Sequence, residues 1–521
     1  MRLDKVNNTR RNIIYGLVWR LYITIMPFII RTIFIYVLGV EYLGLDSLFV
    51  SILNVLSLAE LGIGSALVFH MYKAIANDDK ETICQLMSFY RKCYRIIGII
   101  VLIIGSSLIP ILKFLVKQDL PSDVNLYILY VIQLGATVVS YWLFAYKNCL
   151  LNAFQRNDLI SKVNIALMTV QYIFQIVLLL LVKNYYYYIA IVPVINILKN
   201  IVTSFVVNKY YPDYLPNGKI PDETRKDIFV KVKALLFSKI GAIIVSSSDT
   251  IVISAFLGLK LSGIYSNYHY IITAVIGFIS IIFESMTAGI GNSLQLDSIE
   301  KNYKEYKVVT LLNNWIIMFC SISLMCLFQP FVVVWLGEVY LLPTFTSLLL
   351  CVFFYFWKSN NVMLLYKDAK GLWHEDRFRP LIVGIINTIL DLILVINFGI
   401  NGVIIASISV YALIAIPWLF YNVHKHIFNN SPKEMVLGFF LNIVVTVLIG
   451  LLTYYACSLV SFGDGSRMMN GMLLLVKFFI CLILPNILFI LINIKNKNLR
   501  LIKSLFIKEE VKFNENRNDN I

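Results

Sequence analysis

Three basic side chains interrupt apolar stretches that are long enough to cross a lipid bilayer. Arg20 and Arg31 lie in the apolar run 13–38, and Lys239 lies near the start of the run 234–257. An ionisable group inside such a stretch is costly, so it marks a functional position by default. The planar guanidinium of Arg can donate two parallel hydrogen bonds to phosphate oxygens, whereas the ammonium of Lys acts as a point charge. If these side chains face a common cavity, they would bind an anionic headgroup.

The spacing of the polar residues places each basic group on a defined face of its expected helix. Arg20 and Arg31 share one face because they lie about three helical turns apart. A similar stripe in the second run consists of Lys239, Ser246, Thr250 and Ser254. Two other interpretations stay open. Arg20 and Lys239 could snorkel towards the membrane surface, and Arg31 could pair with an acid.

Four acids also fall inside apolar runs, and they are Glu60, Asp249, Glu284 and Asp391. A buried carboxylate takes up a proton, binds Na⁺ or neutralises a basic neighbour. Coupling to an H⁺ or Na⁺ gradient is therefore one role for these acids, and charge balance for the basic residues is the other. The polar segments contain no Walker loop, dinucleotide-binding turn or metal-ligand motif, so we expect no cofactor beyond such an ion.

The composition shows which solvent these stretches face. The chain is 59% hydrophobic and 14% charged, with a mean hydropathy of +0.78, whereas soluble domains carry about 25% charged residues. Most of the chain is therefore expected to lie in lipid. The net charge of +15 fits Lys and Arg gathered on the cytoplasmic side of a membrane, and we expect no nucleic-acid partner.

The eight cysteines show no CxxC spacing and no pairing pattern. We therefore expect no disulfide framework and no zinc site. Most of the cysteines fall inside apolar runs and are interpreted as small hydrophobes, in particular Cys320, Cys326, Cys351 and Cys481.

We expect an all-α integral membrane protein with about fourteen spanning helices. The expected spans are 13–38, 43–70, 94–116, 125–146, 159–182, 188–208, 234–257, 263–291, 308–336, 342–366, 380–398, 401–423, 435–459 and 470–493. With a cytoplasmic N-terminus, most Lys and Arg fall in the connections on that side of the membrane. An even number of spans then returns the C-terminus to the cytoplasm.

One glycine motif occurs twice. The stretch VLGVEYLGLDSLF at 37–49 is followed, 219 positions later, by FLGLKLSGIYSNY at 256–268, and Arg20 and Lys239 share this offset. The repeat predicts two parallel six-helix lobes related by a pseudo-two-fold axis along the membrane normal, with two further helices after them. The expected parts are an N-terminal lobe (1–210), a cytoplasmic linker (211–233), a C-terminal lobe (234–424), the last two helices (425–493) and a cytoplasmic tail (494–521).

A resemblance to a known family rests on the expected architecture, the LGxxxxG turn and the run SSDTIVISAFLGLKLSGIYSNY at 247–268. The chain resembles the polysaccharide transporter branch of the multidrug/oligosaccharidyl-lipid/polysaccharide exporter (MOP) superfamily. Wzx-type flippases for O-antigen and capsule repeat units belong to that branch. The resemblance implies a flippase of the bacterial inner membrane. It would carry an undecaprenyl-pyrophosphate-linked oligosaccharide to the outer leaflet by alternating access.

The resemblance also implies a cationic cavity, which we assign to Arg20, Arg31 and Lys239. It implies a monomer that works beside a polysaccharide polymerase and glycosyltransferases. A second interpretation is a cation-coupled drug or metabolite antiporter of the multidrug (MATE) type, for which the four acids would form the site. A membrane glycosyltransferase or polymerase is disfavoured because every expected external connection is short, so we expect a transporter and not an enzyme.

Overall fold

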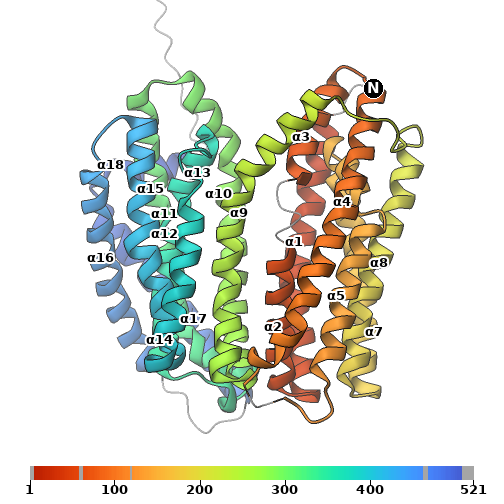
Figure 1. The fold of residues 1–521 in the computed structure, drawn as a ribbon. Coiled ribbons are helices and arrows are strands. Elements are labelled where there is room, and N and C mark those ends of the chain that lie inside the picture. The colour runs from red at the N-terminus through yellow and green to blue at the C-terminus, as the bar shows by residue number, and fades with distance from the viewer. Residues whose placement is uncertain (1–4, 58–62, 118–119, 461–466, 507–521) are drawn as a thin grey trace, which may run out of the picture. The chain divides into compact units, whose positions relative to one another are not determined.

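The computed structural model describes residues 5–57, 63–117, 120–460 and 467–506, and the described chain is almost entirely helical, with no strand (Figure 1). Its α-helices are α1 (Lys5–Val37), α2 (Val40–Leu56), α3 (Ile63–Ala76), α4 (Lys80–Leu108), α5 (Leu126–Trp142), α6 (Asn148–Ala153), α7 (Asn157–Leu181), α8 (Tyr185–Tyr210), α9 (Asp222–Leu257), α10 (Leu259–Leu296), α11 (Ile299–Trp335), α12 (Thr344–Ser359), α13 (Asn361–Lys370), α14 (Arg379–Val410), α15 (Ile416–Val423), α16 (Lys433–Ser458), α17 (Arg467–Asn493) and α18 (Lys497–Phe506). The predicted all-α class is confirmed.

Polar residues at the helix starts explain several of these boundaries. Asp79 precedes α4 and accepts a hydrogen bond from the backbone N–H of Thr82, and Asn125 and Asn184 cap α5 and α8 in the same way. Such caps satisfy backbone N–H groups that have no partner within the helix. The hydrogen bonds from Thr82 also lower the pKa of Asp79.

Eleven helices of the described chain are long and apolar enough to cross a membrane, or twelve if the bent pair Leu126–Trp142 and Ala145–Ala153 is one span. One of the eleven, Arg379–Phe428, contains a reversal. Gly399 has φ 55° and ψ −137°, which is not helical. Ser407 donates a hydrogen bond of 3.0 Å to the side-chain oxygen of Asn387, although a straight helix would separate them by about 30 Å.

The chain therefore turns back at Gly399, between the two spans predicted at 380–398 and 401–423. The span predicted at 43–70 corresponds to α2 and α3, and residues 58–62 between those helices lie outside the described residues. The count of fourteen spans stays a prediction.

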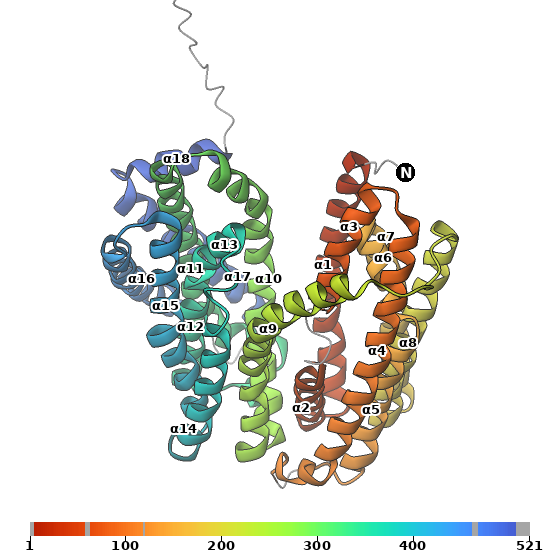
Figure 2. The same cartoon turned by 45° about the horizontal axis from the view of Figure 1, so that its top comes forward.

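The helices form two compact units. The first consists of Met1–Phe278, Trp335–Leu349 and Trp373–Ala415, and the second of Ile279–Val334, Leu350–Leu372 and Ile416–Ile521. In the first unit α1 packs on α7, α7 on α8, α4 on α5 and α9 on α14, and Figures 1 and 2 both show α4, α5, α7 and α8 side by side. In the second unit α16 packs on α17 and α13 on α15. The predicted lobe boundaries stay a prediction.

The repeated glycine motif forms a reciprocal contact within the first unit. A Cβ atom added at Gly44 would lie 2.0 Å from the carbonyl oxygen of Leu259, and one added at Gly263 would lie 2.2 Å from that of Val40. Because Leu259 and Gly263 lie 219 positions after Val40 and Gly44, each half of the contact mirrors the other. Only glycine allows two helix backbones to approach so closely.

The residues just before this contact also match. Gly39 has φ 107° and ψ 168°, and Gly258 has φ 95° and ψ 165°. Both backbones are in a region that glycine reaches and other residues avoid. The two copies of the motif therefore share their sequence, their backbone conformation and a contact with two-fold reciprocity.

Candidate functional site

A polar cavity of about 440 Å³ lies among helices of the first unit. Its polar lining comes from five helices: Arg31 of α1, Asp46 of α2, Gln133, Thr137 and Ser140 of α5, Gln171 and Gln175 of α7, and Asn196 of α8. Apolar side chains such as Ile30 and Val192 complete the wall. The cavity thus offers amide and hydroxyl groups, one cation and one carboxylate within an apolar helix bundle.

Arg31 is held at this cavity by α10. Its guanidinium donates hydrogen bonds to the hydroxyl of Ser266 at 3.2 Å and to the amide oxygen of Asn267 at 3.1 Å, and it lies 4.8 Å from the centre of the Tyr270 ring. Arg31 also interacts electrostatically with Asp46. The guanidinium has five N–H donors, so these two hydrogen bonds leave donors for a ligand.

Sequence reasoning missed Asp46 and the three glutamines. Asp46 lies inside the repeated motif itself, between Leu45 and Ser47 of an apolar run, and that position was the available signal. Nothing in the sequence indicated that Gln133 and Gln171 would face the same space, because the two positions lie on separate helices. The electrostatic interaction with Asp46 supports the interpretation in which Arg31 pairs with an acid.

A second cavity of the first unit, of about 410 Å³, shares Ser140 and Asn196 with the first. Its other polar lining residues are Tyr90, Tyr94, Tyr141, Asn148, Asn152, Lys199 and Asn200. Lys199 of α8, which lies inside a predicted span, is placed on the wall of this cavity. The two cavities give the first unit an extended polar interior.

Arg20 and Lys239 line neither of these cavities. The guanidinium of Arg20 lies against α10, where a Cβ added at Gly277 would come within 2.9 Å of its Nη2 atom. Lys239 is half-buried on α9, and within the described part of the chain its ammonium forms no hydrogen bond or ion pair. The joint action of Arg20, Arg31 and Lys239 on one headgroup stays a prediction.

Two of the predicted acids meet in the first unit. Asp249 of α9 is 7% exposed and Asp391 of α14 is fully buried, and their carboxyl groups are within hydrogen-bonding reach of each other. The amide of Asn387 donates to Asp391 at 2.8 Å and to Asp249 at 3.2 Å. Two carboxylates this close cannot both be ionised without a compensating charge, which a proton or a bound cation would supply.

The surroundings of this pair suit a small cation. Hydroxyl groups of Ser248, Tyr265 and Ser407 bond the two carboxyls. One oxygen of Asp391, Oδ1, is buried without a hydrogen-bond partner among the described residues. A fully buried carboxylate oxygen that lacks a donor is costly, and a proton or an oxygen-binding cation at that atom would remove the cost.

The other two predicted acids do not join this pair. Glu284 is exposed on α10, in the part of that helix that belongs to the second unit. Glu60 lies outside the described residues. Of the four acids, only Asp249 and Asp391 are brought together by the described structure, and they come from helices about 140 residues apart in the chain.

Residues 9–288 match the family described as polysaccharide biosynthesis protein. The chain belongs to this family. The family match covers more than half of the sequence and includes both copies of the glycine motif, Arg31, Asp46 and Asp249.

Solved structures of MOP-superfamily transporters share the fold of this family member. The lipid II flippase MurJ in an inward closed conformation has a TM-score of 0.63 at 15% identity, over 92% of this chain and 98% of that one. An inward-facing multidrug resistance MATE transporter has a TM-score of 0.60 at 16% identity, over 78% and 97%. A MOP-superfamily transporter from Pyrococcus furiosus has a TM-score of 0.53 at 16% identity, over 80% and 95%. The comparison with curated proteins found no match.

Proposed function

We propose that this protein is a flippase that moves an undecaprenyl-pyrophosphate-linked oligosaccharide from the inner to the outer leaflet of the bacterial plasma membrane. Its product would be used for a surface polysaccharide such as O-antigen, capsule or exopolysaccharide. Membership of the polysaccharide biosynthesis family and the fold shared with a lipid II flippase support a lipid-linked substrate. The observation that carries the proposal is the polar cavity in which Arg31 is fixed among amide side chains.

The chemistry of this cavity suits a glycan with an anionic link. Amide groups such as those of Gln171 and Gln175 both donate and accept hydrogen bonds, which matches sugar hydroxyls. The remaining N–H groups of Arg31 suit phosphate oxygens. Arg20 and Lys239 would add positive charge along the path of the headgroup. The lipid chain stays in the bilayer while the polar head crosses by alternating access.

We further propose that the Asp249–Asp391 pair couples the cycle to H⁺ or Na⁺. The pair is buried, its two carboxyls compete for ionisation, and one oxygen of Asp391 has no hydrogen-bond partner in the described part of the chain. Asp249 lies on α9, and Asp391 lies on α14 before the reversal at Gly399. Ser407, which donates a hydrogen bond to Asp249, lies on α14 after that reversal. Occupation of the site by an ion would therefore favour one packing of these helices over another.

A cation-coupled drug antiporter of the MATE type is the second candidate, favoured by the shared fold and by Asp46 in the cavity wall. A cationic drug in that cavity would meet the guanidinium of Arg31, with which Asp46 interacts. This opposing charge is why we place the antiporter second.

Deletion of the gene in its host separates the two functions. The flippase predicts loss of a surface polymer, with lipid-linked repeat units retained at the inner leaflet and restored by the wild-type gene. The antiporter predicts an unchanged polymer and increased sensitivity to cationic drugs. An unchanged polymer with unchanged lipid-linked intermediates would refute the flippase proposal.

A further inference from the structure

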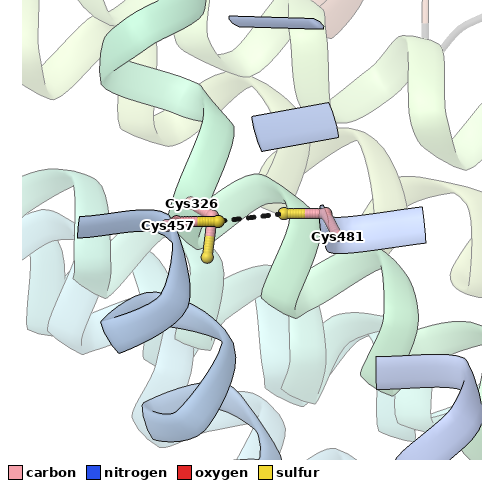
Figure 3. A group of neighbouring side chains, drawn as sticks. All are labelled: Cys326, Cys457 and Cys481. Carbon is pink, nitrogen blue, oxygen red and sulfur yellow. Dashed lines mark hydrogen bonds between the residues drawn. The ribbon is translucent and has the colours of Figure 1, made fainter. Parts of the chain in front are cut away.

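We propose that Cys326, Cys457 and Cys481 form a site for a soft closed-shell metal cation, copper(I), inside the second unit. The three residues come from three helices, α11, α16 and α17, and Figure 3 shows the sulfur atoms of Cys457 and Cys481 facing each other with that of Cys326 close by. They are 5%, 3% and 1% exposed, respectively. The inference does not depend on the proposed transport function.

The distances between the sulfur atoms match a three-coordinate site. The Sγ atoms of Cys457 and Cys481 are 3.8 Å apart, and all three Sγ atoms lie within 4.8 Å of one another. Metal–thiolate bonds of about 2.3 Å in a trigonal plane place the sulfur atoms about 4.0 Å apart. Shifts of less than about 1 Å would therefore complete the coordination, which side-chain rotation of cysteine allows.

The chemistry of the ligand atoms indicates which metal ion would bind. Thiolates favour copper(I), zinc and iron–sulfur clusters, but structural zinc takes four ligands. Within the described residues the group contains three cysteines and no histidine or carboxylate. The same buried cluster contains Met318 and, packed against it, Met325, whose thioethers are also soft donors. Copper(I) is satisfied by three sulfur ligands, and so it fits this site better than zinc.

The charge of the site has a local counter-ion. Copper(I) bound by three thiolates carries a net charge of −2, which is costly in an apolar helix bundle. Lys477 lies one helical turn before Cys481 on α17, and it interacts electrostatically with both Cys457 and Cys481. Each thiol that binds as a thiolate releases its proton to solvent, so copper(I) binding should weaken as the pH falls.

The experiment uses the full-length protein, purified in detergent without oxygen and reduced with ascorbate. Copper(I) is titrated in competition with the chromogenic chelator bicinchoninate, and X-ray absorption reports the ligand shell. The test variant is C326A/C457A/C481A, and the matched control is C84A/C93A/C149A, which removes the same number of cysteines from the first unit. The single variant Cys326→Ala serves if the triple variant does not fold.

We expect the wild type and the control to bind one high-affinity copper(I) ion with a shell of sulfur atoms only. The triple variant should lose this ion, and Cys326→Ala should weaken its binding by about 100-fold. Equal copper(I) affinity in the wild type and Cys326→Ala would overturn the proposal. A Cys457–Cys481 disulfide in protein isolated without reductant, detected by mass spectrometry, would also overturn it, because the pair would then be a redox bond and not a ligand set.

Discussion

Buried polar groups of the first unit meet in networks of oxygen and nitrogen atoms, whereas three sulfur atoms meet inside a hydrophobic cluster between α11, α16 and α17 of the second unit. Arg31, Asp249 and Asp391 occupy networks of hydroxyls and amides, while Cys326, Cys457 and Cys481 touch mainly one another and apolar side chains. Hard donors recognise phosphates, sugars, protons and sodium, and soft donors recognise copper-like ions. The two regions are therefore expected to respond to different ligands.

The largest effect is expected from Arg31→Ala, which removes the cation from the first cavity and leaves Ser266 and Asn267 without their donor. Loss of a charged hydrogen-bond donor costs about 1.5–3 kcal/mol, which corresponds to a roughly 10- to 100-fold lower export of surface polymer. Arg31→Lys should retain part of the export activity, because the positive charge remains but the paired N–H donors of the guanidinium are lost.

Surface glycan per cell, normalised to the amount of protein in the membrane fraction, is the measurement. Ile25→Ala on the same helix is the matched control, since Ile25 is 54% exposed and lines neither cavity. Full export by folded Arg31→Ala protein would remove Arg31 from the proposed headgroup site.

The next effect concerns ion coupling in the same unit. Asp391→Asn keeps the shape of the side chain but removes the ionisable group that lies beside Asp249, so translocation should no longer respond to an imposed Na⁺ or pH gradient. Transport of lipid-linked oligosaccharide in reconstituted vesicles is the measurement. Glu284→Gln is the control, because Glu284 is exposed and should leave the response unchanged. A gradient response that survives in Asp391→Asn would show that the pair only balances charge.

The repeated glycine contact should be sensitive to a single methyl group. Gly44→Ala or Gly263→Ala would place Cβ within 2.2 Å of a backbone oxygen on the facing helix, and overpacking of this kind costs about 1–3 kcal/mol. Gly135→Ala, where no atom of the described residues beyond its own helix lies within 4 Å of the new Cβ, should be neutral or stabilising by up to about 1 kcal/mol. Thermal unfolding in detergent measures all three. Equal unfolding temperatures would show that the two motifs do not pack as described.

The smallest effect is expected at an exposed ion pair of the second unit. Lys307 and Glu434 are 2.6 Å apart, but the Glu434 side chain is 65% exposed. Such pairs contribute about 0–1 kcal/mol, so Glu434→Gln should change the free energy of unfolding by less than about 1 kcal/mol. Denaturant unfolding compared with Lys307→Met provides the check. A larger loss would show that hard polar groups also stabilise the second unit, which would weaken the contrast between the two regions.

Several features were predictable from the sequence because they depend on local composition. The apolar runs predicted the helices, since backbone groups in lipid must bond within one helix. The break between the spans predicted at 380–398 and 401–423 fell at the reversal at Gly399, and the repeated glycine motif recurred as two matching glycine conformations at Gly39 and Gly258. Asp249 and Asp391 stood out as ionisable residues inside apolar runs, where charges are rare, and both are buried.

The partners of those residues were not predictable. Asp46 was overlooked beside Arg31, the pairing of Asp249 with Asp391 was left open, and the cysteines were interpreted separately as small hydrophobes. Each group joins helices that are far apart in the chain, as in the meeting of Cys326 with Cys457 and Cys481. Periodicity assigns a face to a side chain but does not identify the helix that this face meets.

By itself, therefore, the sequence determined that the chain enters a membrane. It also determined the positions of most helices along the chain and the side chains that would be costly to bury. These properties depend on transfer free energies and backbone hydrogen bonding, both of which act over short segments. Only the tertiary structure decided that Arg31 meets Asp46 at a cavity, that two aspartates share a site, and that three thiols converge. Those outcomes depend on the packing of distant helices, because close packing selects which side chains become neighbours.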